Sequence, residues 1–280
     1  MTGAVRKAGR KLARDFGEVE HLQVSKKGPA DFVSTADAKA EETLFEELSR
    51  ARPGYSFLME ERGLVEGTDK SHRWIIDPLD GTTNFLHGQP HFAVSVALER
   101  EGELIAGIVY NPATDDFFHA EKGRGAYVND RRLRVSGRVH FDECVIATGM
   151  PFAGKSGHAR FLTELHAIMP HTAGIRRYGA ASLDLAWTAA GRFDGFFERG
   201  LKAWDVAAGA LIVTEAGGEF TAMLGEEITF KEAKSENDKF NILGSNALLH
   251  ETVVGSFQKV RKAHVTTAPT KMEEKKQGDN

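Results

Sequence analysis

The stretch Trp74 to Phe85, WIIDPLDGTTNF, joins an apolar strand to a turn that holds two carboxylates. The two isoleucines carry a buried strand to its carboxyl end, and Pro78 fixes its own φ and stops the strand. A turn of this kind can bring Asp80 back beside Asp77. Two anions held together need a cation, so the stretch predicts a strand end built around a metal ion.

The residues after the turn favour a phosphate-binding site. Gly81 lets the chain turn tightly, and residues 82–84 supply hydroxyls and backbone N–H groups at what reads as a helix start. A purely local reading is also open. In it, Asp77 begins an Asx turn and Asp80 caps the following helix.

Three further acidic residues stand at the ends of predicted elements. Glu60 follows YSFLM, Asp205 lies in AWDVAAG and Asp37 ends STAD. Each has a local explanation too, because Asp205 favours a helix N-terminus and the residues from Ser34 to Asp37 match a capping box. Carboxylates without a Cys or His cluster form an oxygen-only ligand set, which selects Mg²⁺ over Zn²⁺. Together with the phosphate-binding site, these carboxylates predict metal-assisted phosphate chemistry.

Composition argues against several classes of protein. The chain has 280 residues, 41% of them hydrophobic, enough for one large domain. Its formal net charge of −4 argues against bulk attraction to nucleic acid or an anionic membrane. The sequence contains neither an apolar run of spanning length nor a signal-peptide core, so we expect a cytoplasmic location. The single cysteine, Cys144, excludes an internal disulfide and a multi-thiolate zinc site, and we expect it to be buried.

Hydrophobic periodicity predicts an α+β first half. Apolar residues at steps of three and four predict a helix from Val5 to Phe16, with its basic residues in water, and another from Ala36 to Leu48. YSFLM and residues 74–76 are predicted strands, separated by a loop at 62–73. The run HFAVSVALEREGELIAGIVYNP alternates like a hairpin around EGE, and strand-like pieces continue to about residue 137.

The second half mixes strands with helices. Strands are expected at CVIATGM, DGFFE and NILGSN, and helices at 160–169, 181–190, 204–216 and LLHETVVGSFQKV. Such alternation is typical of a layered α/β arrangement. From about Ala263 the chain is polar and charged, which predicts a disordered tail at 263–280.

Three segments resemble one family. WIIDPLDGTTNF and WDVAAGALIVTEAGG are similar almost word for word to the two signature segments of the inositol monophosphatase family, and ADFVSTADAKAEETL is similar to its catalytic aspartate segment. The resemblance covers about residues 4 to 260. The family comprises lithium-sensitive, Mg²⁺-dependent sugar phosphatases. The resemblance therefore implies a phosphatase that acts on myo-inositol 1-phosphate or a related sugar or polyol phosphate.

The resemblance also implies roles for particular residues. The implied ligands of two or three Mg²⁺ ions are Glu60, Asp77, the carbonyl of Leu79, Asp80 and Asp205. Asp37 and Thr82 would orient and activate the attacking water. The implied substrate contacts are Asp80, Gly81, Thr82, Gly179, Ala180, Ala181, Glu198 and Asp205. Met59 departs from the family, in which many members carry Gly before the paired acids, and the role of Glu61 stays open.

The implied fold is a layered αβαβα sandwich of the inositol monophosphatase and fructose-1,6-bisphosphatase type. It would form a single domain over residues 1–262, with an α+β metal-binding half to about residue 140 and an α/β half from about residue 141. Because Asp205 comes from the second half and the other implied ligands from the first, the site would lie where the halves meet. The resemblance also implies a homodimer.

Other functions stay open. Related phosphatases of the superfamily act on fructose 1,6-bisphosphate, histidinol phosphate, NADP or adenosine 3′,5′-bisphosphate, and the sequence separates these substrates poorly. Some bacterial members bind the transcription machinery, so a regulatory role is a second hypothesis. The basic clusters RKAGRK and DRRLRVSGR suit contact with RNA or RNA polymerase, or a solvated surface.

Overall fold

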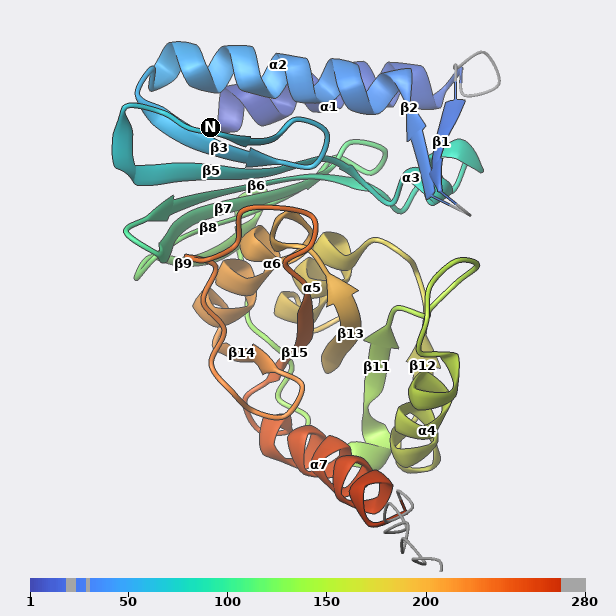
Figure 1. The fold of residues 1–280 in the computed structure, drawn as a ribbon. Helices are drawn as coiled ribbons and strands as arrows, with labels where there is room; N and C mark the ends of the chain where they lie inside the picture. Colours follow the sequence, from blue (N-terminus) through green and yellow to red (C-terminus); the bar gives the residue numbers. More distant parts are fainter. Residues whose placement is uncertain (19–23, 29–30, 268–280) are drawn as a thin grey trace, which may run out of the picture.

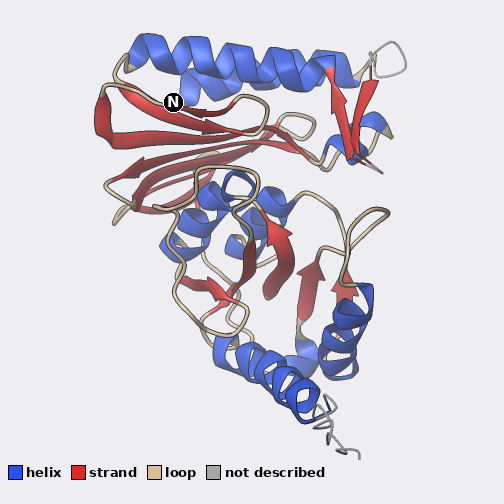
Figure 2. Ribbon diagram, viewed as in Figure 1, coloured by secondary structure: helices blue, strands red, loops and turns tan. Residues whose placement is uncertain are grey.

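The computed structural model describes residues 1–18, 24–28 and 31–267, and the side chains of residues 24–28, 31–34 and 263–267 are not described. Helices and strands alternate in layers in the order α, β, α, β, α (Figure 1). The two sheet layers are separate in space, with helices between them and on both outer sides (Figure 2). The predicted αβαβα sandwich is confirmed.

The larger sheet is formed by strands from the first half of the chain. Its strands in the described chain, in spatial order, are β10 (Arg131–Arg132), β9 (Gly125–Val128), β8 (Asp116–Glu121), β7 (Glu103–Asn111), β6 (Ala93–Arg100), β5 (Asp69–Asp80), β3 (Tyr55–Met59) and β4 (Gly63–Val65). β3 and β5 are parallel, whereas the other neighbours pair antiparallel. The predicted hairpin is confirmed by the pairing of β6 with β7.

Two long helices cover the outer face of this sheet. They are α1 (Thr2–Phe16) and α2 (Thr35–Ala51), and both confirm the predicted periodicity (Figure 1). Their apolar stripes are buried against the sheet. The basic residues of α1 lie at the surface, as expected, and there Lys7 donates to Glu47 on α2 at 2.6 Å. The polar face of α1 is thus partly occupied by contacts with its neighbour. Near the start of α2, β1 (Val24–Gly28) pairs with β2 (Asp31–Ser34).

The smaller sheet comes from the second part of the chain. Its strands in the described chain, in spatial order, are β12 (Gly174–Arg176), β11 (Val145–Thr148), β13 (Gly195–Leu201), β15 (Phe240–Asn246) and β14 (Gly218–Ala222). Its outer face packs against α4 (His158–Ile168) and α7 (His250–Thr267). Cys144, just before β11, is 0% exposed, so its predicted burial is confirmed.

Two helices fill the space between the sheets, namely α5 (Ala181–Ala189) and α6 (Ala203–Glu215) (Figure 1). The sequence of α6 is apolar on every side, which is typical of a helix that is buried all round. It packs on β6 and β7 of the larger sheet and on β14 of the smaller one. One buried core therefore joins both sheets, and it contains Ile75, Leu185 and Ile212.

The structure corrects some predicted boundaries. The loop expected at 62–73 contains β4 and the start of β5, because β3 and β6 provide backbone partners for it. β14 was not predicted. The disordered tail expected at 263–280 is wrong for residues 263–267, because α7 continues to Thr267, and residues 268–280 lie outside the described part. Among the helices that the structure describes, none is long and apolar enough to cross a membrane.

Candidate active site

The end of β5 carries the two carboxylates of the motif. The N–H of Leu79 donates to Asp77 Oδ1 at 3.0 Å, which is the Asx turn of the local reading. The pairing of β5 with β6 is irregular between Asp77 and Asp80, so the strand bends where these side chains stand. Gly81 follows in the left-handed region with φ 88°, a conformation that favours glycine, and α3 (Thr82–Leu86) begins immediately after it.

The candidate catalytic pair lies together. The hydroxyl of Thr82 is 3.2 Å from Asp37 Oδ1 and 3.0 Å from the carbonyl oxygen of Leu79, so its single proton has two acceptors. Asp37 is in the first turn of α2 and is 1% exposed. The side chain of Ser34, its expected partner in a capping box, is outside the described part. The fold thus brings α2 and α3 together across 45 residues of sequence.

Asp205 stands in the first turn of α6, in the second half of the chain. Its Oδ2 accepts the N–H of Lys202 at 2.7 Å, so Asp205 does cap its helix, as the local reading has it. The start of α6 is tied to the larger sheet, because the hydroxyl of Ser95 on β6 donates to the carbonyl oxygen of Trp204 at 3.1 Å. Ser95 pairs with Asp77 across the sheet, so this contact brings Asp205 toward the end of β5.

The paired acids after β3 are held by a glutamate that the sequence did not single out. The N–H of Glu60 donates to the carbonyl oxygen of Ile76 on β5 at 3.2 Å. The N–H of Glu61 donates to Oε2 of Glu41, a buried residue of α2, at 2.8 Å. Met59 is fully buried, so the larger residue at this position packs into the core. Glu41 thereby fixes the turn that carries the candidate ligand Glu60.

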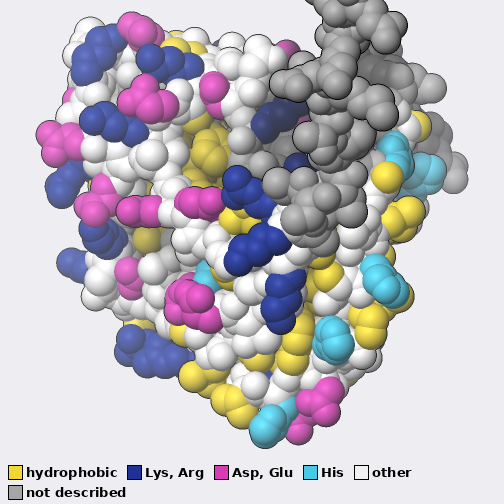
Figure 3. Space-filling model, turned by 60° about the horizontal axis from the view of Figure 1, so that its bottom comes forward, with side chains coloured by type: hydrophobic (Ala, Val, Ile, Leu, Met, Phe, Trp, Pro, Cys, Tyr) yellow, Lys and Arg dark blue, Asp and Glu magenta, His cyan; other side chains and the backbone are white. Residues whose placement is uncertain are grey.

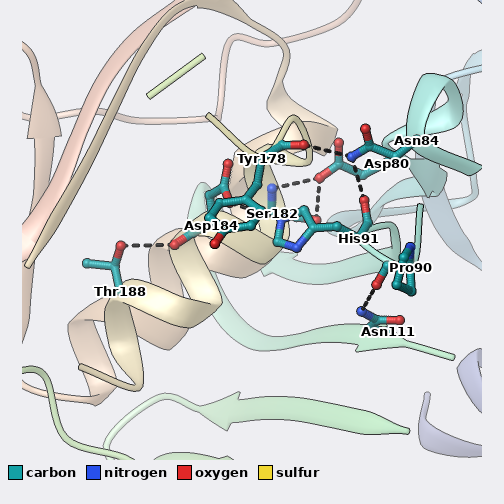
Figure 4. Close-up of polar contacts among 9 residues, drawn as sticks. All are labelled: Asp80, Asn84, Pro90, His91, Asn111, Tyr178, Ser182, Asp184 and Thr188. Carbon is teal, nitrogen blue, oxygen red and sulfur yellow. Dashed lines mark hydrogen bonds and ion pairs between the residues drawn. The ribbon is translucent and has the colours of Figure 1, made fainter. Parts of the chain in front are cut away.

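The expected substrate segment, 179–181, packs directly against Gly81. A Cβ at Gly81 would lie 3.1 Å from the Cβ of Ala180 and 3.0 Å from the carbonyl oxygen of His91. Asn84 on α3 crosses between the halves, because its Nδ2 donates to the carbonyl oxygens of Tyr178 at 2.8 Å and His91 at 2.7 Å (Figure 4). The two backbone segments expected to hold the substrate therefore touch.

Glu198 on β13 belongs to the same neighbourhood. Burial, and then the nearby charges of Asp184, Asp205 and Asp80, raise its pKa well above the usual value. Its carboxyl group lies over Gly149, since a Cβ there would be 1.9 Å from Cδ of Glu198. Only a residue without a side chain leaves room for this placement.

Sequence reasoning missed a buried polar group on α5. Ser182 donates both its N–H and its hydroxyl to Asp80 Oδ2, at 2.7 and 2.6 Å. Asp184 is 3.0 Å from Nε2 of His91 and also accepts the backbone N–H of Gly179. Figure 4 shows these side chains converging from α5, from the end of β5 and from the segment before β6. A signal was present, because polar residues in an otherwise apolar helix require partners.

The carboxylates raise one another's pKa values. Burial, and then Glu60, Asp80 and Asp205, raise the pKa of Asp77 well above its usual value. Burial, and then Asp80, raise the pKa of Asp205 to about 7. Burial raises the pKa of Asp80 to about 6, although the two hydrogen bonds from Ser182 oppose the rise. Several anions thus lie within electrostatic range of one another in a poorly solvated place.

These residues fit a hard cation. The donor set is made of carboxylate oxygens, and a divalent ion would offset the mutual repulsion that raises the pKa values. Asp77, Asp80 and Asp205 each accept a backbone N–H on one oxygen, which fixes the direction of the other. As the side chains stand, the described residues include no group of three or more His, Cys, Asp or Glu already placed to hold a metal ion.

Stability should depend on pH in a way that reports these shifts. Asp80 and Asp205, with pKa values of about 6 and about 7, stay protonated in the folded protein where the unfolded chain, near pKa 3.9, is ionised. Between about pH 4 and 7 the folded state therefore binds more protons, and the free energy of unfolding falls as pH rises. We expect the Tm in EDTA to be a few degrees higher at pH 5 than at pH 8.

Thermal unfolding of the metal-free protein across this range checks the prediction. Asp205→Asn should flatten the pH dependence, because it removes one of the titrating groups. A Tm in EDTA that is equal or lower at pH 5 would contradict the assignment of raised pKa values.

The layered fold, with acidic side chains gathered where two sheets and their helices meet, defines the class of metal-dependent phosphatases. Within it, the chain belongs to the inositol monophosphatase family, whose model matches residues 1–262. An inositol-1-monophosphatase of Caulobacter vibrioides is 60% identical over 256 residues, which cover 91% of this chain and 98% of the relative.

Two further relatives carry a different name. The crystal structure of the extragenic suppressor protein SuhB from Bartonella henselae matches with a TM-score of 0.86 and 53% identity, covering 92% of this chain and 97% of that one. The Nus factor SuhB of Pseudomonas aeruginosa is 46% identical over 219 residues, 77% of this chain and 81% of the relative. The fold is shared across proteins with both names.

Proposed function

We propose that the protein hydrolyses the phosphate monoester of myo-inositol 1-phosphate, or of a closely related polyol, with Mg²⁺ as its cofactor. The observation that carries this proposal is the meeting of Asp77, Asp80 and Asp205 beside the hydrogen-bonded pair Asp37 and Thr82. Relatives of about 60% identity that are named inositol-1-monophosphatase support the activity and the substrate. Two or three ions, bound by Glu60, Asp77, Asp80, Asp205 and the carbonyl of Leu79, form part of the proposal.

When bound, the cation lowers the pKa of a water and neutralises charge on the phosphoryl oxygens. The chain then supplies alignment and a proton acceptor. The hydroxyl of Thr82 can accept a proton from the attacking water while it passes its own proton to Asp37. The two oxygens, Thr82 Oγ1 and Asp37 Oδ1, are 3.2 Å apart. Gly81 stands just before α3 and Thr82 is its first residue. Backbone N–H groups at a helix start have no partner within the helix, so those of Gly81 and Thr82 suit a phosphoryl oxygen.

The second half supplies the contacts to the polyol. In this proposal the carboxylate of Glu198 accepts hydrogen bonds from ring hydroxyls. The backbone of residues 179–181 donates hydrogen bonds to the hydroxyl oxygens or accepts them from the hydroxyl groups. Glu198 suits this role because its carboxyl group is within electrostatic range of Asp80 and Asp205. Substrate would therefore bridge the two halves of the chain, and its orientation relative to the water would follow from their packing.

Phosphate release from a panel of esters tests the proposal. The purified protein should hydrolyse myo-inositol 1-phosphate with Mg²⁺, lose activity in EDTA and regain it when Mg²⁺ is added in excess. Inhibition by Li⁺ is expected from the family resemblance. The panel should include fructose 1,6-bisphosphate, histidinol phosphate, NADP and adenosine 3′,5′-bisphosphate. A higher kcat/KM on one of these esters would identify it, rather than myo-inositol 1-phosphate, as the preferred substrate. Full activity after chelation would show that the reaction does not need a metal ion.

Glu198→Gln should separate polyol recognition from phosphate chemistry. A carboxylate accepts strong hydrogen bonds from hydroxyls that p-nitrophenyl phosphate lacks. We expect kcat/KM to fall roughly tenfold more on myo-inositol 1-phosphate than on p-nitrophenyl phosphate. Glu219→Gln, at an exposed position of the same sheet, is the control and should change neither. Equal losses on both substrates would give Glu198 a structural role.

A regulatory role is a second candidate, since relatives such as the one from Pseudomonas aeruginosa are named Nus factor SuhB. The basic residues proposed for RNA contact are partly engaged within the chain. Lys7 pairs with Glu47, and the guanidinium of Arg138 is 3.0 Å from Asp194 Oδ1. On the left of the face in Figure 3, acidic and basic side chains are interspersed, and a short row of basic side chains lies near its middle. Pull-down with purified RNA polymerase tests this role, and light scattering tests the proposed homodimer.

A further inference from the structure

Ser182 connects the two halves through Asp80. It is the second residue of α5, and its N–H and hydroxyl both donate to Asp80 Oδ2, at 2.7 and 2.6 Å (Figure 4). The side chain of Ser182 is 0% exposed, so bulk water does not compete for these bonds. Two donors on one oxygen restrict the carboxylate to a single orientation.

Ser182 is itself held independently of Asp80. Two residues further along α5, Asp184 is 3.0 Å from Nε2 of His91, and both are buried. Asn84 ties the preceding segment to α3 through the carbonyl oxygen of Tyr178. The first turn of α5 therefore has a fixed place relative to β5, whether or not Asp80 is charged. The donors at Ser182 are a preorganised feature of the fold.

We propose that Ser182 is a positioning residue for the metal-binding carboxylate of Asp80. By occupying Oδ2 it leaves Oδ1 as the oxygen offered to the cation and removes the rotational freedom that binding would otherwise have to restrict. The inference rests on the proposed function, because it takes Asp80 as a metal ligand. In the competing account, Asp80 only caps α5 by accepting the N–H of Ser182 and has no relation to metal affinity. The cap of the following helix that the local reading gave to Asp80 is wrong, because no side chain in the described part of the chain caps α3.

Ser182→Ala tests the inference with a small change. It keeps the backbone N–H bond, and with it the cap, and it removes only the hydroxyl donor. Calorimetric titration of the metal-free protein with Mg²⁺ should show a Kd raised roughly tenfold, the usual scale for removing a group that orients a metal ligand. The Mg²⁺ concentration for half-maximal activity should rise by the same factor, while kcat at saturating Mg²⁺ changes little.

Thr188→Val is the matched control. Thr188 lies on the same helix, is 0% exposed, and donates its hydroxyl to the carbonyl oxygen of Asp184 at 2.9 Å (Figure 4). Its removal costs α5 one buried hydroxyl hydrogen bond, here to a backbone carbonyl oxygen, without touching Asp80. We expect the Tm in EDTA to fall as it does for Ser182→Ala, or further, with the Mg²⁺ affinity unchanged.

The outcomes separate the two accounts. A Mg²⁺ Kd for Ser182→Ala within about twofold of the Thr188→Val value would overturn the inference and leave Asp80 as a cap. Ser182→Cys keeps a side chain of similar size with a weak donor, so it should raise the Kd in the same direction and serves if the alanine variant does not fold. Mg²⁺ binding is measured without substrate. If the wild-type protein binds Mg²⁺ but does not release phosphate, only the proposed function fails.

Discussion

Asp37→Asn should lower kcat by about 10² at saturating Mg²⁺ while the protein stays folded. The amide keeps the shape of the buried side chain but loses the negative charge that makes Asp37 a proton acceptor for Thr82. Thr82→Ala should give a similar loss, because the pair is joined by a hydrogen bond of 3.2 Å. If the two act as a unit, the double variant should be little worse than either single one.

The competing account for Asp37 is local. As a first-turn acid of α2, it interacts favourably with the helix N-terminus, and this account predicts a loss of stability of about 1 kcal/mol or less with nearly normal turnover. Thr43→Ala is the control for Thr82→Ala. Thr43 is buried, Thr82 is half-buried, and the hydroxyl of Thr43 donates to the carbonyl oxygen of Lys39 at 2.7 Å. Near-normal kcat in Asp37→Asn, or losses that multiply fully in the double variant, would end the idea of paired activation.

Asp80→Asn and Asp205→Asn should weaken Mg²⁺ binding by roughly 10² or more, since the loss of a ligand should exceed that of a group that orients it. Activity should fall accordingly. The metal-free proteins should be as stable as the wild type or more stable, because each substitution removes one member of a cluster of anions that raise one another's pKa. The amide oxygen can still accept the N–H bond that Asp205 takes from Lys202, so the helix cap is kept.

Two comparisons make this test discriminating. Asp205→Ala loses both charge and cap, so it should be less stable than Asp205→Asn by about 1 kcal/mol with an equal loss of Mg²⁺ affinity. Asp194→Asn is the matched control, because Asp194 is buried but pairs with Arg138, and the change should destabilise the protein without altering Mg²⁺ affinity. Full activity of folded Asp205→Asn and Asp80→Asn would establish capping as the only role of these acids.

The sequence predicted those features of the candidate site that depend only on residues close along the chain. The Asx turn at Asp77 spans two residues and the cap at Asp205 spans three, so short-range backbone geometry specifies both. The motif segments also name Asp37 and Thr82, although their contact spans 45 residues. That contact was expected from the resemblance, and local pattern alone does not supply it.

The contacts of α5 could not be predicted in this way. Ser182 lies 102 residues after Asp80, and His91 lies 93 residues before Asp184. Such pairs depend on how the helices between the two sheets pack, and the sequence pattern showed only that a polar residue in an apolar helix needs some partner. Glu41, which fixes the turn at Glu60 and Glu61, was missed for the same reason.

The sequence by itself determined the secondary structure of the strongly periodic segments and the local turns and caps that carry the acids, because each depends on neighbours within about one turn or one strand. Tertiary structure decided the rest. The segment 62–73 became strand because β3 and β6 offered it backbone partners. Ser182 donates to Asp80 because α5 is buried against the core that joins both sheets. Pairing and packing over long separations arise only when the layers assemble, so no local pattern encodes them.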